Sequence, residues 1–97
     1  MKNHVGQGKT MELEEIMEVL SASDRWGVND QPSIGRAASV LSEIPLSYVV
    51  VEADDTVRVF LKRPMTQREC FIFIRGLSFD APEKVSDIQT EFKLWWD

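Results

Sequence analysis

The sequence is short of the residues that build disulfides, metal sites and nucleophilic catalytic sites. Its 97 residues include one cysteine and one histidine. The single thiol, Cys70, excludes an intramolecular disulfide and a cysteine-rich zinc site, and it indicates a reducing compartment. The histidine, His4, lies in a segment without hydrophobic periodicity, where no general base would be held in place. We therefore expect a protein that is not an enzyme and that has no cofactor and no metal site.

Long apolar runs are absent as well. No stretch approaches the about 18 apolar residues of a membrane span, and residues 1–10 lack the apolar segment of a secretory leader. We therefore expect a cytoplasmic protein with no membrane association. The tripeptide Gly8-Lys9-Thr10 resembles the end of a phosphate-binding loop, but Asn3 stands where that motif has its first glycine. A tail that leads into a helix cap at Thr10 is the simpler interpretation.

The composition is that of a small globular domain. Hydrophobic residues make up 43% of the chain and charged residues 28%, which argues against intrinsic disorder and fibrous repeats. Residues 1–9 contain two glycines and no periodic pattern. We expect a flexible N-terminal tail over 1–9 and a single α+β domain over 10–97.

Hydrophobic periodicity predicts the elements of that domain. Apolar residues recur at helical spacing in two segments, and β-branched or aromatic runs between turn residues predict three strands. The predicted helices cover 11–22 and 33–44, and the predicted strands cover 47–53, 56–63 and 69–75. Short connections make these strands an antiparallel β-meander, on which the helices pack.

A third helix is predicted at the end of the chain. The sequence Asp-Ala-Pro-Glu at 80–83 is typical of a helix start, and the spacing of Val85, Ile88 and Phe92 predicts a helix over 81–96. In such a helix Trp95 continues the buried stripe, whereas Trp96 lies about 100° around the axis and is more exposed. An exposed tryptophan here either anchors a partner or covers the rim of the core. The expected element order is α-α-β-β-β-α.

The charge is unevenly distributed along the chain. Eleven Lys and Arg against sixteen Asp and Glu give a net charge of -5, which weighs against attraction of the whole molecule to nucleic acid. Residues 1–55 have a net charge of -6, residues 56–75 of +4 and residues 76–97 of -3. The molecule is therefore polarised, with a basic segment between acidic ones.

The first predicted helix is strongly acidic. Glu14 and Glu18 are one turn apart, and no Lys or Arg occurs within 10–24 to offset them. A solvated helix face is one interpretation of this pattern. The other is a surface that binds a basic protein partner, such as a nucleic-acid-binding complex, and steers its association. The predicted partner-binding residues are Glu12, Glu14, Glu15, Glu18 and Trp96.

In size and charge the chain resembles small acidic proteins that block nucleic-acid-handling enzymes by imitating DNA, the anti-CRISPR proteins of phages among them. The resemblance rests on length and net charge, without aligned residues. It implies a non-enzymatic inhibitor or adaptor. No site residue is carried over from it.

The basic segment offers an alternative function. Strand alternation predicts two aromatic and basic faces on neighbouring strands, which could stack single-stranded bases and bind phosphates. The residues of this alternative nucleic-acid-binding surface are Arg58, Phe60, Lys62, Phe71, Phe73 and Arg75. A helix that covers the phenylalanines is the competing interpretation. The adjacent Asp54 and Asp55 suit a turn better than a metal site, because no further ligand spacing accompanies them.

Overall fold

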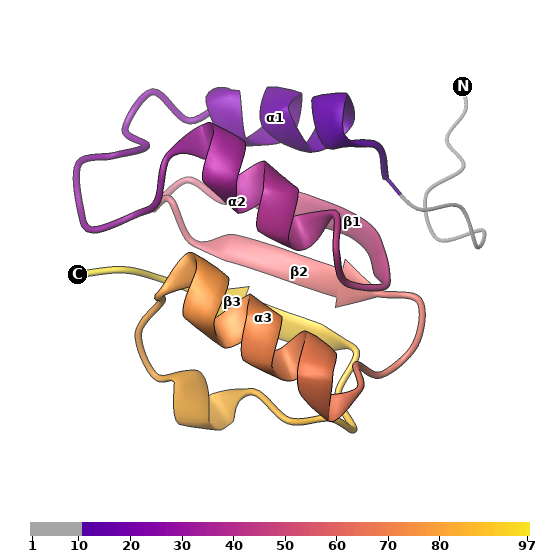
Figure 1. Ribbon diagram of the computed structural model, residues 1–97. Helices are drawn as coiled ribbons and strands as arrows, with labels where there is room; N and C mark the ends of the chain where they lie inside the picture. The colour runs from indigo at the N-terminus through magenta and orange to yellow at the C-terminus, as the bar shows by residue number, and fades with distance from the viewer. Residues whose placement is uncertain (1–10) are drawn as a thin grey trace.

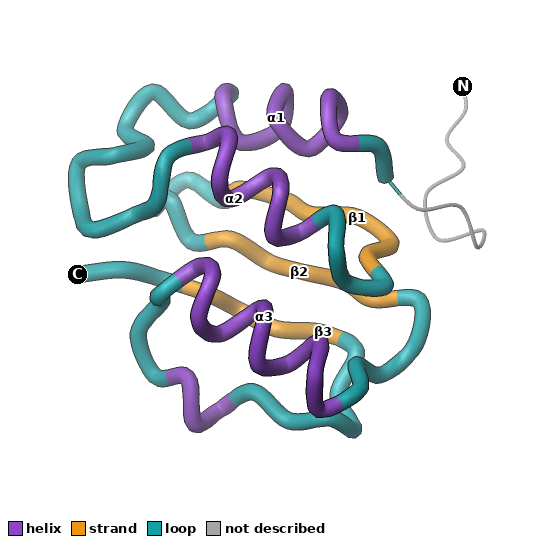
Figure 2. Tube along the Cα trace, in the orientation of Figure 1, coloured by secondary structure: helices purple, strands orange, loops and turns teal. Residues whose placement is uncertain are grey.

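The computed structural model describes residues 11–97. His4, the Gly8-Lys9-Thr10 sequence and the expected cap at Thr10 lie outside the described residues. Figures 1 and 2 show the arrangement of the helices and strands. In chain order the elements are α1 (Leu13–Ser21), α2 (Ile34–Leu41), β1 (Leu46–Val51), β2 (Val57–Leu61), α3 (Gln67–Leu77), the 3-10 turn η1 (Pro82–Lys84) and β3 (Glu91–Leu94).

The strands form one antiparallel sheet in the order β1-β2-β3. The helices lie together on one face of this sheet, with α2 between α1 and α3 (Figure 1). The register pairs Val49 with Val59 and Val59 with Phe92, so these buried residues line up across all three strands. The expected α+β fold, with helices on a three-stranded antiparallel sheet, is confirmed.

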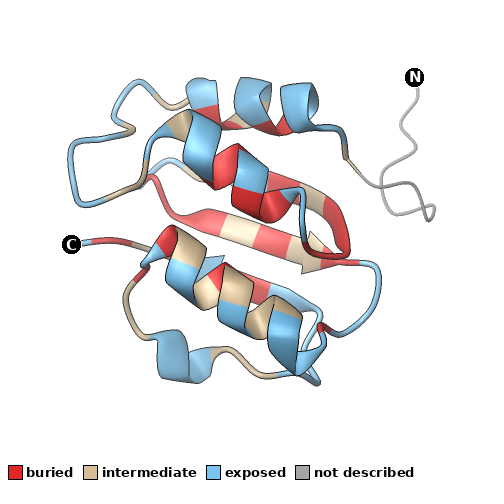
Figure 3. Ribbon diagram, in the orientation of Figure 1, coloured by how far each residue is buried: buried red, intermediate tan, exposed pale blue. Residues whose placement is uncertain are grey.

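The core lies between the sheet and the helix layer (Figure 3). Phe73 of α3 is fully buried, and its ring centroid lies 5.3 Å from that of Phe79 and 5.6 Å from that of Phe92. Ile16 and Leu20 anchor α1 in the same core. Burial of one such side chain stabilises the fold by about 1.5–3 kcal/mol. One core therefore holds the outer helices and the sheet together.

The prediction of a strand over 69–75 is wrong, because these residues belong to α3. The helix begins with a capping box: the Glu69 N–H donates to the Thr66 hydroxyl at 3.1 Å, and the Thr66 N–H donates to the Glu69 carboxylate at 2.8 Å. Phe73 and Leu77, one turn apart, are both buried. A short apolar run fits a strand as well as a buried helix, and here the cap and the helical spacing decide.

The prediction of a helix over 81–96 is also wrong. Within this range only η1, residues 82–84, forms a helical turn. Ile88, a residue of the predicted buried stripe, is 81% exposed. The chain then extends into β3, where Phe92 and Leu94 are buried and Glu91 and Lys93 are exposed. This two-residue alternation is the period of a strand. The third strand is therefore β3, and the element order is α-α-β-β-α-β.

Candidate protein-interaction site

One narrow face of α1 holds the helix on the domain. Ile16 and Leu20 are fully buried, whereas Leu13 and Met17, in a neighbouring row one turn apart, remain 44% and 37% exposed. The sequence places all four in one apolar stripe, and the structure leaves the second pair at its rim. Helix α1 therefore presents an apolar row to solvent.

A row of carboxylates runs beside this apolar row. Glu14 and Glu18 are both exposed and one turn apart. Among residues 11–97, neither carboxylate makes an ion pair. The last turn of α1 contains no basic residue. Two neighbouring carboxylates without a counter-charge give this side of the helix a negative potential.

Glu12 and Glu15 instead have a local role at the start of the helix. The backbone N–H of Glu12 donates a hydrogen bond to the Glu15 carboxylate at 2.8 Å. A carboxylate in the first turn also lies near the positive end of the helix dipole, which stabilises it. Glu14 shares this position in the first turn, but neither Glu14 nor Glu18 takes part in the capping box of Glu12 and Glu15.

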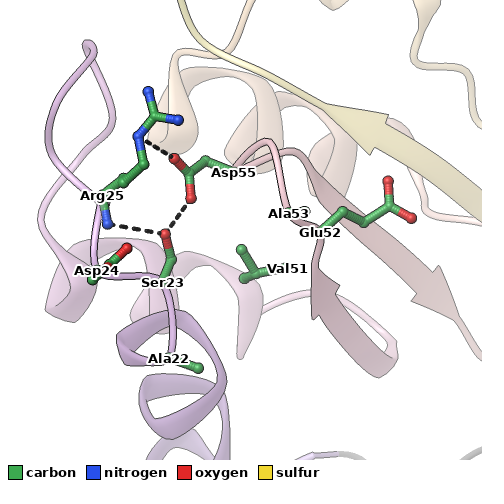
Figure 4. Close-up of a pocket in the computed structure, with 8 residues that line it drawn as sticks. All are labelled: Ala22, Ser23, Asp24, Arg25, Val51, Glu52, Ala53 and Asp55. Carbon is green, nitrogen blue, oxygen red and sulfur yellow. Dashed lines mark hydrogen bonds and ion pairs between the residues drawn. The ribbon is translucent and has the colours of Figure 1, made fainter.

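The C-terminal end of α1 is fastened to the β1–β2 hairpin (Figure 4). The Ser23 hydroxyl donates a hydrogen bond to one carboxylate oxygen of Asp55, and Arg25 Nε lies 3.5 Å from the other. Asp55 is buried and adopts the left-handed conformation, with φ 64°, in the loop between β1 and β2, where its N–H donates a hydrogen bond to the Glu52 carbonyl at 2.8 Å. This single aspartate therefore fixes both the hairpin and the segment that follows α1.

A cleft of about 240 Å³ borders this contact (Figure 4). Its lining residues are Ala22, Ser23, Asp24, Arg25, Val51, Glu52, Ala53 and Asp55. The buried carboxylate in the cleft, that of Asp55, is already engaged by Ser23 and Arg25. The cleft thus joins the end of α1 to the hairpin.

Asp54 has a similar structural role. Its carboxylate accepts a hydrogen bond from the Thr56 N–H at 3.1 Å, and hydrogen bonds from Thr56 lower the pKa of Asp54. Within the described part of the chain, no three His, Cys, Asp or Glu side chains are placed to hold a metal ion. Asp54 and Asp55 both serve the hairpin turn.

Trp96 does not lie where the sequence predicted. It is 6% exposed, and its indole N–H donates a hydrogen bond to the Leu77 carbonyl at 2.8 Å. Its ring meets that of Trp26 edge-on, with centroids 5.5 Å apart. Trp95 is the more exposed of the two neighbours, and the Lys84 ammonium lies 5.4 Å from its ring centroid. The prediction of an exposed Trp96 is wrong because the segment is not helical and Trp96 covers the end of the core.

The predicted aromatic and basic surface is divided between two elements. Arg58 and Phe60 lie on the sheet face away from the helices, in alternation with the buried residues of β2. Phe60 stacks on Tyr48 with centroids 4.3 Å apart, and Arg58 makes ion pairs with Glu91 at 2.9 Å and Glu52 at 3.5 Å. Neighbouring carboxylates therefore offset the central cation of this face.

The other residues predicted for that surface lie elsewhere. Lys62 follows β2 and is exposed, whereas Phe71, Phe73 and Arg75 belong to α3. Phe73 is fully buried, and Phe71 is 59% exposed with the Arg75 guanidinium 5.1 Å from its ring centroid. The prediction of two adjacent aromatic strand faces is therefore wrong. The outer face of α3, with Arg68, Phe71 and Arg75, is a feature that the strand assignment concealed.

Comparisons with known proteins give no relative from which a function could be transferred. No family model, no curated protein and no solved structure matches the chain. No helix in residues 11–97 is long and apolar enough to cross a membrane.

Proposed function

We propose that this chain is a non-enzymatic interaction protein, an inhibitor or adaptor that binds a cationic surface of a protein partner through α1. The observation that carries the proposal is the pairing of two exposed rows on one helix. The first row is apolar, Leu13 and Met17, and the second is acidic, Glu14 and Glu18. We call these four residues the α1 surface.

The two rows have complementary roles in binding. Burial of the exposed parts of Leu13 and Met17 supplies a non-directional driving force of about 25 cal/mol per Å² of apolar area removed from water. The carboxylates add orientation and a faster association with a positively charged partner. Methionine also adapts to irregular partner surfaces, because its side chain is unbranched and flexible. The combination fits a basic partner with an apolar centre better than it fits a purely electrostatic contact.

The basic surface of a nucleic-acid-binding protein is the partner class that this chemistry favours. Such proteins bind phosphates with Lys and Arg, and carboxylates can take the place of those phosphates beside the basic side chains. Inhibition would then follow from direct competition with the nucleic acid. We place this function in the cytoplasm, where the unpaired thiol of Cys70 would stay reduced.

Direct binding of nucleic acid by this chain has weaker support. Arg58 lies between Glu52 and Glu91 on the open sheet face, and the net charge of the chain is -5. A phosphate approaching Arg58 would meet both carboxylates. Filter binding of a labelled oligonucleotide at low salt tests this alternative, which predicts retention that salt abolishes.

The test of the proposal is a charge reversal on α1 with a matched control. Glu14→Lys with Glu18→Lys reverses the acidic row, and Glu83→Lys with Asp87→Lys makes the same change in net charge at exposed positions outside α1. Each chain is immobilised, and the proteins that it captures from an extract of the cells in which the protein naturally occurs are identified by mass spectrometry. A specific partner is expected with the wild-type and control chains and is lost with the α1 variant. Equal capture by all three chains would refute the proposal.

A further inference from the structure

The outer face of α3 complements the α1 surface in charge. Arg68, Phe71 and Arg75 lie on the exposed side of α3, with Phe71 59% exposed between the two cations. The Arg75 guanidinium lies over the Phe71 ring, 5.1 Å from its centroid. This face therefore has an apolar centre and basic flanks, as α1 has an apolar row and an acidic one. We call these three residues the α3 surface.

A groove continues the α3 surface toward α2. It encloses about 520 Å³ between the two helices and is lined by Arg36, Ser39, Val40, Glu43, Ile72, Arg75 and Gly76. Arg36 Nε donates a hydrogen bond to the Gly76 carbonyl at 3.1 Å, which ties α2 to α3. The groove thus has apolar side chains from both helices, two arginines and one glutamate, Glu43, so its net charge is positive.

The arrangement of the helix layer allows the acidic and the basic helix of two copies to meet. Helix α1 and helix α3 flank α2 on the same face of the sheet (Figure 1). When two such layers meet face to face around a two-fold axis parallel to α2, α1 of each copy lies against α3 of the other. Both contacts then join an acidic surface to a basic one, and the assembly closes as a dimer.

We propose that a second copy of this chain occupies the groove and the α3 surface, with its α1 surface as the contacting element. Leu13 and Met17 of one copy pack on Phe71 and in the groove of the other, and Glu14 and Glu18 face the arginines. At 0.1 M salt the Debye length is about 10 Å, so the facing rows attract while more distant charges of the two acidic molecules are screened. This inference rests on the α1 surface of the proposed function and names a second occupant for it, so dimer formation and partner binding would compete.

The experiment is sedimentation velocity at 0.1 M salt over a range of protein concentrations, with charge reversals on each side of the contact. Variant A carries Glu14→Arg and Glu18→Arg, and variant B carries Arg68→Glu and Arg75→Glu. The wild-type chain is expected to form a dimer, and each variant alone should have a dissociation constant at least ~10-fold higher. An equal mixture of A and B should form a heterodimer, because one copy is then basic on both surfaces and the other acidic on both. Glu83→Arg with Asp87→Arg is the control and should dimerise as the wild type does.

Several results would overturn the proposal. They are a wild-type chain that stays monomeric, variants that dimerise like the wild type, and a mixture of A and B that does not associate. A monomeric wild type whose binding of a labelled oligonucleotide is lost in variant B would assign the α3 surface to nucleic acid instead. Variant B also separates this inference from the proposed function, because it removes the dimer contact and leaves the α1 surface intact. Capture of the protein partner by variant B, together with loss of the dimer, is the result expected if both proposals hold.

Discussion

The two adjacent tryptophans at the end of the chain give a sharp test of the packing. Trp96 is buried, whereas its neighbour Trp95 lies closer to solvent. Trp96→Ala removes a large buried ring and its edge-on contact with Trp26, and we expect a loss of about 3–5 kcal/mol in the free energy of unfolding. Trp96→Phe keeps one aromatic ring in the core but leaves the Leu77 carbonyl without its donor, which should cost about 1–3 kcal/mol.

These losses are large for a domain of 97 residues, whose total stability is about 5–15 kcal/mol. The matched control is Trp95→Phe, which should cost less than about 1 kcal/mol because that ring is only partly buried. Urea unfolding followed by far-ultraviolet circular dichroism measures all three variants, since the substitutions themselves alter tryptophan fluorescence. Equal losses at the two positions, or a loss below about 1 kcal/mol for Trp96→Ala, would refute the burial of Trp96.

Two further predictions concern α3 and its neighbours. The Arg63 guanidinium and the Thr66 N–H lower the pKa of Glu69 from 4.5 to about 2. The stability that this carboxylate contributes is therefore present above pH 4.5 and is lost as the pH falls toward 2. We expect a loss of ~1 kcal/mol after solvent screening, and Glu69→Gln should remove this part of the pH dependence measured by urea unfolding. Gly76→Ala should destabilise the fold by about 1–3 kcal/mol, because its new Cβ would lie 2.5 Å from a Val40 methyl group. Gly35→Ala should instead stabilise the fold, because the space around Gly35 is open and alanine favours the helix. Thermal unfolding measures both changes.

The sequence was sufficient to predict the helices and strands in the first half of the chain and the α+β class of the whole domain. The helices predicted at 11–22 and 33–44 and the strand predicted at 56–63 contain the observed α1, α2 and β2, and the strand predicted at 47–53 overlaps β1, which begins at Leu46 and ends at Val51. In α1 and α2 the buried side chains recur every three to four residues, and in β2 they recur every two. In β1 the signal was instead the β-branched run from Val49 to Val51. The charged residues of α1, α2 and β2 lie on the face opposite the buried side chains and support the same assignment.

The prediction for the second half of the chain was wrong where the sequence fits both a helical and a strand period. The run from Phe71 to Ile74 is apolar at every position, so it fits a strand until the Thr66–Glu69 capping box is recognised as a helix start. At the other end, Phe92 fits both the helical stripe and the strand alternation with Leu94. Local sequence could not decide this case, because the pairing of β3 with β2 is a contact between segments far apart in the chain.

The candidate site was foreseen in part. The absence of cations near Glu14 and Glu18 was visible in the sequence, and the structure shows no ion pair for them within residues 11–97. The exposure of Leu13 and Met17 was not visible, because periodicity assigns them to the same stripe as Ile16 and cannot show where the rim of the core lies. The α3 surface was missed because it depends on the helical form of residues 67–77.

The most direct test of the central claim is hydrogen exchange of the chain in complex with the partner that wild-type protein captures and the Glu14→Lys, Glu18→Lys variant does not. Backbone amides of α1 are expected to gain protection in the complex, while the strands exchange as in the free chain. The variant mixed with the same partner should show no such gain. Protection confined to the open sheet face around Arg58, or to α3, with none in α1, would contradict the assignment of α1 as the binding surface.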